Sequence, residues 1–149
     1  MRFESLDHTN VDGYIAYLKR AFSEEPDMIT AEQIDEAGIK ARIANPFYQN
    51  TKSILAMENN KVVGRLEYHF YGCIQDGYRM AYLDWVYVLR DYRRQGIAAQ
   101  LFREFEKDCK KNGIHQYYLI CAENQAAEAF YNSFDNAEIE KVSVFRKTF

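Results

Sequence analysis

The run AYLDWVYVL, residues 81–89, constrains the fold most, because apolar side chains stand at both its odd and its even positions. A strand with two apolar faces is covered on both sides, which is typical of layered α/β proteins. Helical spacing of apolar residues follows from about Gln95 to Asn112, and Gly113 is placed to end that helix. A strand, a helix and then the apolar run HQYYLICA at residues 115–122 predict a parallel crossover.

The remaining segments predict shorter elements separated by turn residues. The first three are a strand over Arg2–Leu6, a helix capped by Thr9 or Asn10, and a helix that begins at Thr30, with Gln33 in a capping box, and ends before Asn45-Pro46. Two strands follow, over Ser53–Met57 and Val62–Phe70, joined at Asn59-Asn60, and the next turn is at Asp76-Gly77. After the parallel crossover come a helix from Asn124 to about Phe134 and a closing strand over Ala137–Lys147. The order β-α-α-β-β-β-α-β-α-β predicts an α/β (α+β) fold with a mixed, mostly antiparallel central sheet flanked by helices. We expect one domain over residues 1–149.

Composition argues against several classes of protein. Cys73, Cys109 and Cys121 stand far apart without a CxxC pair, which indicates reduced thiols and a cytoplasmic protein. No apolar run approaches the ~20 residues of a membrane span. The three histidines lack metal-site spacing and no basic stripe is present, so we expect no metal and no nucleic-acid partner. The segment Glu24–Glu36 holds six acidic residues and no basic one, and is either a solvated face or a rim that attracts a cationic substrate.

Three arginines, Arg90, Arg93 and Arg94, stand where the predicted helix after the apolar strand begins. A helix N-terminus carries a partial positive charge, so arginines are unfavourable there unless an anion completes the site. Gly96 and the small Ala98 would let a polyphosphate approach the backbone. Alternatively, the arginines cover surface or pair with acidic neighbours, namely Asp91 and Glu104.

The motif R-x-x-G-x-A at residues 93–98 and the later N-x-x-A-x-x-x-Y at residues 124–131 resemble the GNAT superfamily of acyl-CoA-dependent N-acyltransferases. The resemblance implies acetyl-CoA as cosubstrate, with its diphosphate on the loop before the helix. The cofactor-binding residues that it implies are Val86, Tyr87, Val88, Arg93, Arg94, Gln95, Gly96, Ile97, Ala98, Asn124 and Ala127.

Acetyl transfer to an amine needs N–H donors for the developing oxyanion, which the resemblance assigns to Val86–Val88, and groups that move protons. The resemblance assigns the acid that protonates the leaving thiolate to Tyr131, although this residue could instead pack in a core with Phe130 and Phe134. Asp84 is the single carboxylate in a run that is otherwise expected to be buried, which makes it a candidate base, and strand alternation places it on one face with Tyr82, Val86 and Val88. Alternatively, it forms an ion pair with an arginine, Arg65 or Arg79. Glu67 and His69, on one face of the preceding strand, are second candidates.

The segment Tyr82-Leu83-Asp84 and the tail EIEKVSVFRKTF are similar to branches of the family that acetylate aminoglycosides or polyamines. This similarity implies direct transfer to a primary amine of a small cationic substrate in a ternary complex. Asp135-Asn136 departs from the family's Gly-Phe, which leaves room for a CoA-binding sensor or scaffold. Protein or peptide N-acetylation is another alternative, and a homodimer is expected as possible from the aromatic surplus and exposed strand edges.

Overall fold

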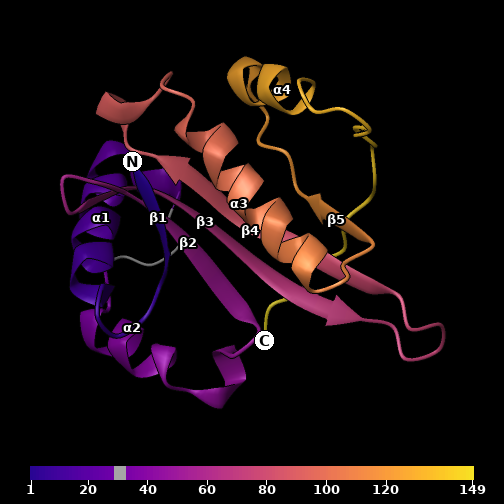
Figure 1. Cartoon of the computed structure of the whole chain (residues 1–149), viewed down its shortest axis with the longest axis horizontal. Helices are drawn as coiled ribbons and strands as arrows, with labels where there is room; N and C mark the ends of the chain where they lie inside the picture. The colour runs from indigo at the N-terminus through magenta and orange to yellow at the C-terminus, as the bar shows by residue number, and fades with distance from the viewer. Residues whose placement is uncertain (29–32) are drawn as a thin grey trace. The chain divides into compact units, whose positions relative to one another are not determined.

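Five strands form one sheet in the first part of the chain. The computed structural model describes residues 1–28 and 33–149, and the chain forms two compact units, Met1–Leu119 and Ile120–Phe149. The strands are β1 (Arg2–Ser5), β2 (Thr51–Glu58), β3 (Lys61–Gly72), β4 (Arg79–Val88) and β5 (Gln116–Leu119), and they lie side by side in chain order (Figure 1). The first four are antiparallel and β5 is parallel to β4. The predicted mixed, mostly antiparallel sheet is confirmed.

The sequence predicts both turns that join the central strands. Asn59 and Asn60 both have positive φ, 49° and 59°, as a two-residue turn between antiparallel strands requires. In the next hairpin Gly77 has φ 69°, and the Asp76 side chain accepts a hydrogen bond from the Tyr78 N–H at 3.1 Å. Both predicted turns are confirmed, and they fix the register of β2, β3 and β4.

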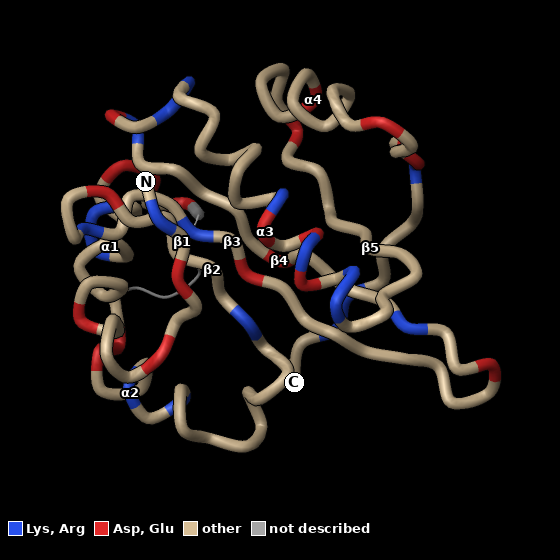
Figure 2. Tube along the Cα trace, viewed as in Figure 1, with Lys and Arg blue, Asp and Glu red and all other residues tan. Residues whose placement is uncertain are grey.

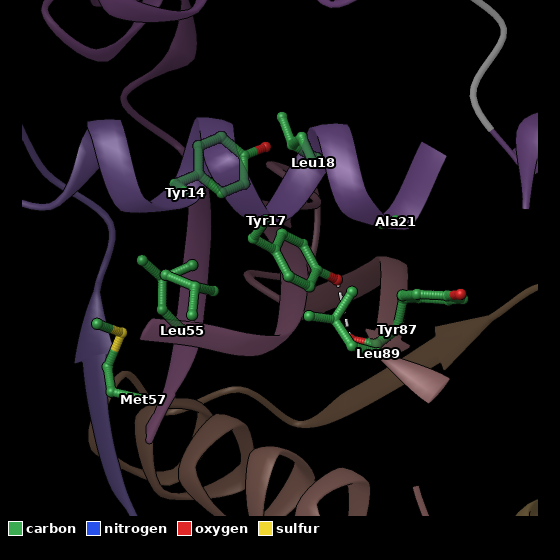
Figure 3. Packing of buried hydrophobic residues seen from close by; sticks show 9 residues of the cluster. Tyr14, Tyr17, Leu18, Ala21, Leu55, Met57, Tyr87 and Leu89 are labelled. Carbon is green, nitrogen blue, oxygen red and sulfur yellow. Dashed lines mark hydrogen bonds between the residues drawn. The ribbon is translucent and has the colours of Figure 1, made fainter. Parts of the chain in front are cut away.

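Helices α1 (Val11–Glu24) and α3 (Ile97–Lys111) cover opposite faces of this sheet. On the face of α1, a buried cluster joins its Tyr14 and Tyr17 to Leu55 of β2 and Tyr87 of β4. The Tyr17 hydroxyl donates a 2.9 Å hydrogen bond to the Tyr87 carbonyl, drawn dashed in Figure 3. Three of the chain's tyrosines thus fill this layer.

The face of α3 depends on a glycine in β3. A Cβ placed on Gly64 would lie 3.3 Å from Val88 Cγ2, and 3.4 Å from both Ile97 Cγ2 and Leu101 Cδ1. The first distance is tighter than ordinary van der Waals contact and the other two lie at its lower limit. Gly64 therefore lets the first turn of α3 lie close to the end of β4.

The end of α3 follows the predicted pattern. Gly113 has φ 64°, its N–H donates to the Lys110 carbonyl at 3.2 Å, and the Ile114 N–H donates to the Cys109 carbonyl at 3.0 Å. This pair of bonds is the Schellman arrangement that a glycine after a helix favours. The helix then returns the chain to β5, which confirms the parallel crossover.

Three predicted elements differ in the structure. The expected start of the second helix at Thr30 lies outside the described residues; α2 spans Glu36–Ile43, and Asp35 caps it by accepting from the Gly38 N–H. The strand predicted over residues 115–122 is shortened to β5, which is only half-buried because it lies at the sheet edge. The predicted closing strand, Ala137–Lys147, has no regular secondary structure. Its alternating pattern permits pairing, but a strand forms only with a partner edge, and no pairing in the described part of the chain includes it.

The second unit, Ile120–Phe149, contains one helix, α4 (Gln125–Tyr131). Asn124 caps it through a 2.9 Å hydrogen bond from the Ala127 N–H to its side-chain oxygen, as the sequence predicted. Among the residues that the structure describes, no helix is both long and apolar enough to cross a membrane.

Candidate active site

A bulge in β4 determines where the candidate base lies. Glu67 of β3 is opposite Trp85, whereas the next residue of β3, Tyr68, is opposite Leu83, so Asp84 is the extra residue of β4. A bulged residue leaves the ladder and changes the direction of its side chain. Asp84 therefore lies beside His69, with 3.9 Å between Asp84 Oδ2 and His69 Nε2.

Two expectations about Asp84 were wrong. It is not buried, since 48% of its side chain is exposed. It also does not share a face with Val86 and Val88, because the bulge interrupts the alternation that the sequence suggested and those valines face α3. The alternative ion pairs are excluded too: Arg65 pairs with Glu67, and Arg79 donates to the Asn112 carbonyl.

The carboxylate of Glu67 is held by two neighbours. Its Oε2 is in close contact with the Arg65 guanidinium and accepts a 2.9 Å hydrogen bond from Ser53 Oγ. Although burial alone would lower the pKa of the Arg65 guanidinium, the Glu67 carboxylate raises it above its ordinary value. Arg65 is buried and also lies 5.1 Å from the ring of Tyr14 and 5.7 Å from that of Trp85. Glu67 is thus a fixed, partnered carboxylate, whereas Asp84 is open to solvent.

Glu67, His69 and Asp84 come together on one face, with their ligand atoms all within 4.8 Å of one another. Such a distance would permit a metal ion, but the guanidinium of Arg65 already occupies Glu67 and repels a second cation. His69 is oriented from both sides: its Nδ1 lies 3.1 Å from Thr51 Oγ1, and its ring stacks on Tyr82 at 6.2 Å. We call this cluster the acceptor face.

The end of β4 has an open edge. The Leu89 N–H donates to the Val63 carbonyl at 3.0 Å, so odd-numbered backbone groups at this end face β3. By alternation along an antiparallel pair, the N–H groups of Val86 and Val88 point to the opposite edge. There β5 pairs with β4 only over Met80–Leu83, so it does not cover them.

The loop and first turn of α3 leave room for an anion. Gly96 is the N-cap, with φ 75°, and a Cβ built on it would meet only Gln100 Nε2, at 4.0 Å. Within residues 1–28 and 33–149 no side chain caps this helix end, and the first N–H groups of any helix have no intrahelical partner. The small Ala98 keeps the turn clear, so these amide groups fit the diphosphate of a nucleotide cosubstrate.

The three arginines before α3 have different partners; Figure 2 marks Lys and Arg in blue and Asp and Glu in red along the chain. Arg93 Nε donates to the Val88 carbonyl at 2.9 Å, and both Arg93 and Arg90 pair with Glu25. Their predicted alternative partners are engaged elsewhere: Asp91 pairs with Arg20 and Glu104 with Lys107. Arg94 is exposed and has no hydrogen bond or ion pair with any residue that the structure describes. Of these three, Arg94 is thus the one available to meet an anion.

The sequence did not indicate Glu24 and Glu25 as partners of these arginines. The run of acidic residues predicts a solvated face or a rim, but Glu24 accepts 2.9 Å hydrogen bonds from the Tyr87 hydroxyl and from the Arg90 N–H. Burial, and then the bond to Glu24, raise the pKa of Tyr87 to about 12, so the phenol remains a donor. One pattern in the sequence could have predicted these contacts: acidic residues at the end of α1 and basic residues just before α3 are each unfavourable for their own helix, and each set can neutralise the other.

Tyr131, Asn124 and Ala127 belong to the second unit. Tyr131 is half-buried within α4, and its ring packs at 5.6 Å against Phe130. Burial raises the pKa of the Tyr131 hydroxyl above its ordinary value, and Cys121 raises it further. The proton-donating role of Tyr131 stays a prediction.

Comparisons with known proteins agree with this architecture. The chain is 30% identical over 101 residues to an aminoglycoside N(6')-acetyltransferase type 1 from Acinetobacter genomosp. 13; the match covers 67% of this chain and 66% of that protein. An aminoglycoside acetyltransferase from an uncultured soil metagenomic sample, solved with sisomicin, has TM-score 0.83 at 19% identity, covering 99% of this chain and 95% of that one. An aminoglycoside N-acetyltransferase solved with CoA has TM-score 0.73 at 19% identity, covering 98% and 93%. The model of the GNAT acetyltransferase family matches residues 15–135, and the chain belongs to this family.

Proposed function

We propose that the protein transfers an acetyl group from acetyl-CoA to a primary amine of a small cationic molecule, aminoglycoside- or polyamine-like, by direct transfer in a ternary complex. The observation that carries this proposal is the open edge at Val86 and Val88, which lies between the uncapped start of α3 and the bulged Asp84. Membership of the GNAT acetyltransferase family supports the acyl donor. In this proposal residues 1–149 act as one GNAT domain.

Backbone amides would hold the cosubstrate. The N–H groups of the first turn, at Ile97 and Ala98, with Gln95 and the cation of Arg94, would bind the diphosphate. The N–H groups of Val86 and Val88 would donate hydrogen bonds to the thioester carbonyl oxygen and stabilise its developing negative charge. Further contacts to the cosubstrate are proposed for Tyr87, Gly96, Asn124 and Ala127; Arg93 would act by anchoring the loop to the Val88 carbonyl.

The reaction needs two proton transfers. The amine nitrogen attacks the carbonyl carbon and loses its proton to Asp84, directly or through a water, and the carbon–sulfur bond then breaks. The leaving thiolate takes the proton of the Tyr131 hydroxyl. We assign the base to Asp84 rather than Glu67, because Glu67 already accepts from Arg65 and Ser53.

The charge of the acceptor face supports a cationic substrate. Asp84 is exposed, and Glu67 adds a second carboxylate on the same face, so an ammonium ion would be attracted there. The aromatic rings of His69 and Tyr82 flank these acids and can take further cations over their faces. The named activity of the relatives, acetylation of aminoglycosides, is consistent with such an acceptor.

The test is thiol release from acetyl-CoA with a panel of aminoglycosides, linear polyamines, amino acids and peptide N-termini. We expect turnover with at least one polycation and none with neutral or acidic amines. CoA binding in calorimetry together with an inert panel would instead support a sensor or scaffold. Turnover confined to peptides would support a protein N-acetyltransferase.

We infer also that the enzyme acts in the cytoplasm and can form a homodimer. The three free thiols, Cys73, Cys109 and Cys121, support the compartment, because thiols persist in reducing surroundings. The edge strands β1 and β5 offer unpaired backbone groups for a second copy. Light scattering of the purified chain tests the dimer, and a monomer at all concentrations would exclude it.

A further inference from the structure

Two acidic residues stand at the wrong end of α1. Glu24 is its last residue and Glu25 its C-cap, and the last turn contains no basic residue. The C-terminus of a helix carries a partial negative charge, so acids are unfavourable there. The arginines before α3 are the opposite case, because they are cations near a positive helix end. Each helix is thus destabilised by its own flanking charges.

These two sets of charges meet in the fold. Glu24 Oε2 accepts from the Arg90 N–H at 2.9 Å, and Glu25 Oε1 lies 3.2 Å from Arg93 Nη2 and 3.6 Å from Arg90 Nη2. Arg93 in turn spans from Glu25 to the Val88 carbonyl and lies 4.9 Å from the centre of the Tyr87 ring. The acids at the end of α1 therefore hold the backbone from the end of β4 to the start of the loop.

The residue that follows this anchored stretch is in a strained conformation. Arg94 has φ 62°, a left-handed conformation that is unfavourable for a residue with a Cβ, and Gly96 has φ 75°. Such conformations persist where the surrounding structure imposes them, often at ligand sites. The imposed conformation leaves Arg94 without a protein partner among the described residues and places it directly before the uncapped turn of α3.

We propose that Glu24 and Glu25 are positioning residues for the cosubstrate. They engage Arg90 and Arg93, fix the loop, and so direct Arg94 and the first amides of α3 to the diphosphate. This inference rests on the proposed function only for the identity of the cosubstrate. Stability is not the reason for the Glu25 pair with Arg93: the two side chains are 35% and 41% exposed, and exposed ion pairs contribute little to stability.

The direction in which the Kd of CoA changes on removal of the Glu25 charge distinguishes a positioning role from a direct electrostatic effect. Glu25 is an anion near the proposed site of a polyanion, so charge alone predicts that its removal strengthens CoA binding. Positioning predicts the opposite, because an unanchored loop must be ordered when the cosubstrate binds.

The experiment measures CoA affinity by calorimetry, without any acceptor, for Glu25→Gln and for Glu104→Gln. Glu104 is a matched control: it is 34% exposed, against 35% for Glu25, and it pairs with Lys107 on α3. We expect Glu25→Gln to raise the Kd of CoA roughly tenfold, with a similar rise in the KM of acetyl-CoA and kcat changed less than about twofold. Glu104→Gln should leave the Kd unchanged.

Glu24→Gln should raise the Kd at least as much, since Glu24 is 13% exposed and holds a backbone N–H. An unchanged or lower Kd in Glu25→Gln, with CoA still bound by the wild type, would overturn this inference alone. A wild-type chain that binds no CoA would overturn the proposed function as well. Binding of CoA without turnover of any amine would leave the positioning role intact while removing the catalytic one.

Discussion

The cofactor end, residues 86–98, and the acceptor face, made of Glu67, His69 and Asp84, are built in different ways. In the proposed function, the groups that bind the cosubstrate at the cofactor end are mostly backbone amides, and Arg93 anchors the loop through the Val88 carbonyl. At the acceptor face they are side chains on neighbouring strands, brought together by one bulge. Backbone groups suit a cosubstrate shared by a whole family, whereas side chains can change with the acceptor. This difference predicts which kinetic constant each substitution alters.

The largest effect is expected at the acceptor face. Asp84→Asn removes the proposed proton acceptor while keeping the size of the side chain, so kcat should fall roughly a hundredfold or more. The Kd of CoA should stay unchanged, because Asp84 lies on the other face from Val86 and Val88. Initial rates measure kcat, and calorimetry measures the Kd of CoA. Asp12→Asn, which changes an exposed acid on α1, is the control. Equal kcat values in the two variants would show that Asp84 is not the proton acceptor.

Tyr131→Phe tests whether the second unit supplies the acid. We expect kcat to fall roughly tenfold to a hundredfold with CoA affinity unchanged. Because burial raises the pKa of Tyr131 above 10.0, the acid stays protonated through neutral pH, and wild-type kcat should decline only as the pH rises past that raised value. The phenyl ring of the variant has no proton to lose, so the alkaline decline should disappear from its pH profile. An unaltered kcat would assign Tyr131 to packing with Phe130.

Arg94→Gly tests the charge of Arg94 separately from the backbone conformation of its loop. Glycine adopts φ 62° without strain, so the loop geometry should be kept while the cation is lost. The KM of acetyl-CoA should rise roughly tenfold and become less sensitive to salt, with kcat unchanged. Thermal unfolding should show no loss of stability. If KM did not change, the diphosphate would be bound by the amides alone.

The smallest effect is expected from Asp108→Asn, which touches neither region. Burial alone would raise the pKa of the Asp108 carboxyl, but hydrogen bonds from Tyr68 at 2.6 Å and Lys52 at 2.9 Å together outweigh burial, so this pKa lies below its ordinary value. A lowered folded pKa means that the carboxylate stabilises the fold above its unfolded pKa, and that this contribution is lost as pH falls through the folded value. The variant should lose about 1 kcal/mol of unfolding free energy at neutral pH and less in acid, with kcat and KM unchanged. Denaturant titrations at two pH values check this; an equal loss at both would contradict it.

Sequence reasoning was reliable where a local pattern is sufficient. The Asn59-Asn60 turn, the cap at Asn124 and the glycine after α3 were predicted because each depends on the few residues around it. The open loop at Gly96 was predicted for the same reason.

Sequence reasoning failed where the position of a side chain depends on contacts with a distant part of the chain. The bulge at Asp84 exists only in the pairing of β4 with β3, so periodicity along one strand placed the side chain on the wrong face. The partners of Arg90 and Arg93 lie 66 and 68 residues away at the end of α1, and nothing local identifies them. The closing strand failed likewise, because strand-forming residues do not supply their own partner.

Gly64 has a consequence for the two sets of amides. Its missing Cβ lets Ile97 and Leu101 approach the end of β4, and so fixes how far the amides of the first turn of α3 stand from those of Val86 and Val88. A methyl group at this position would have to displace the Val88 side chain, and would press on Ile97 and Leu101 as well, without touching any reacting atom. The spacing between a grip on the phosphates and a grip on the acyl group is therefore set by an atom that is missing from the centre of the sheet.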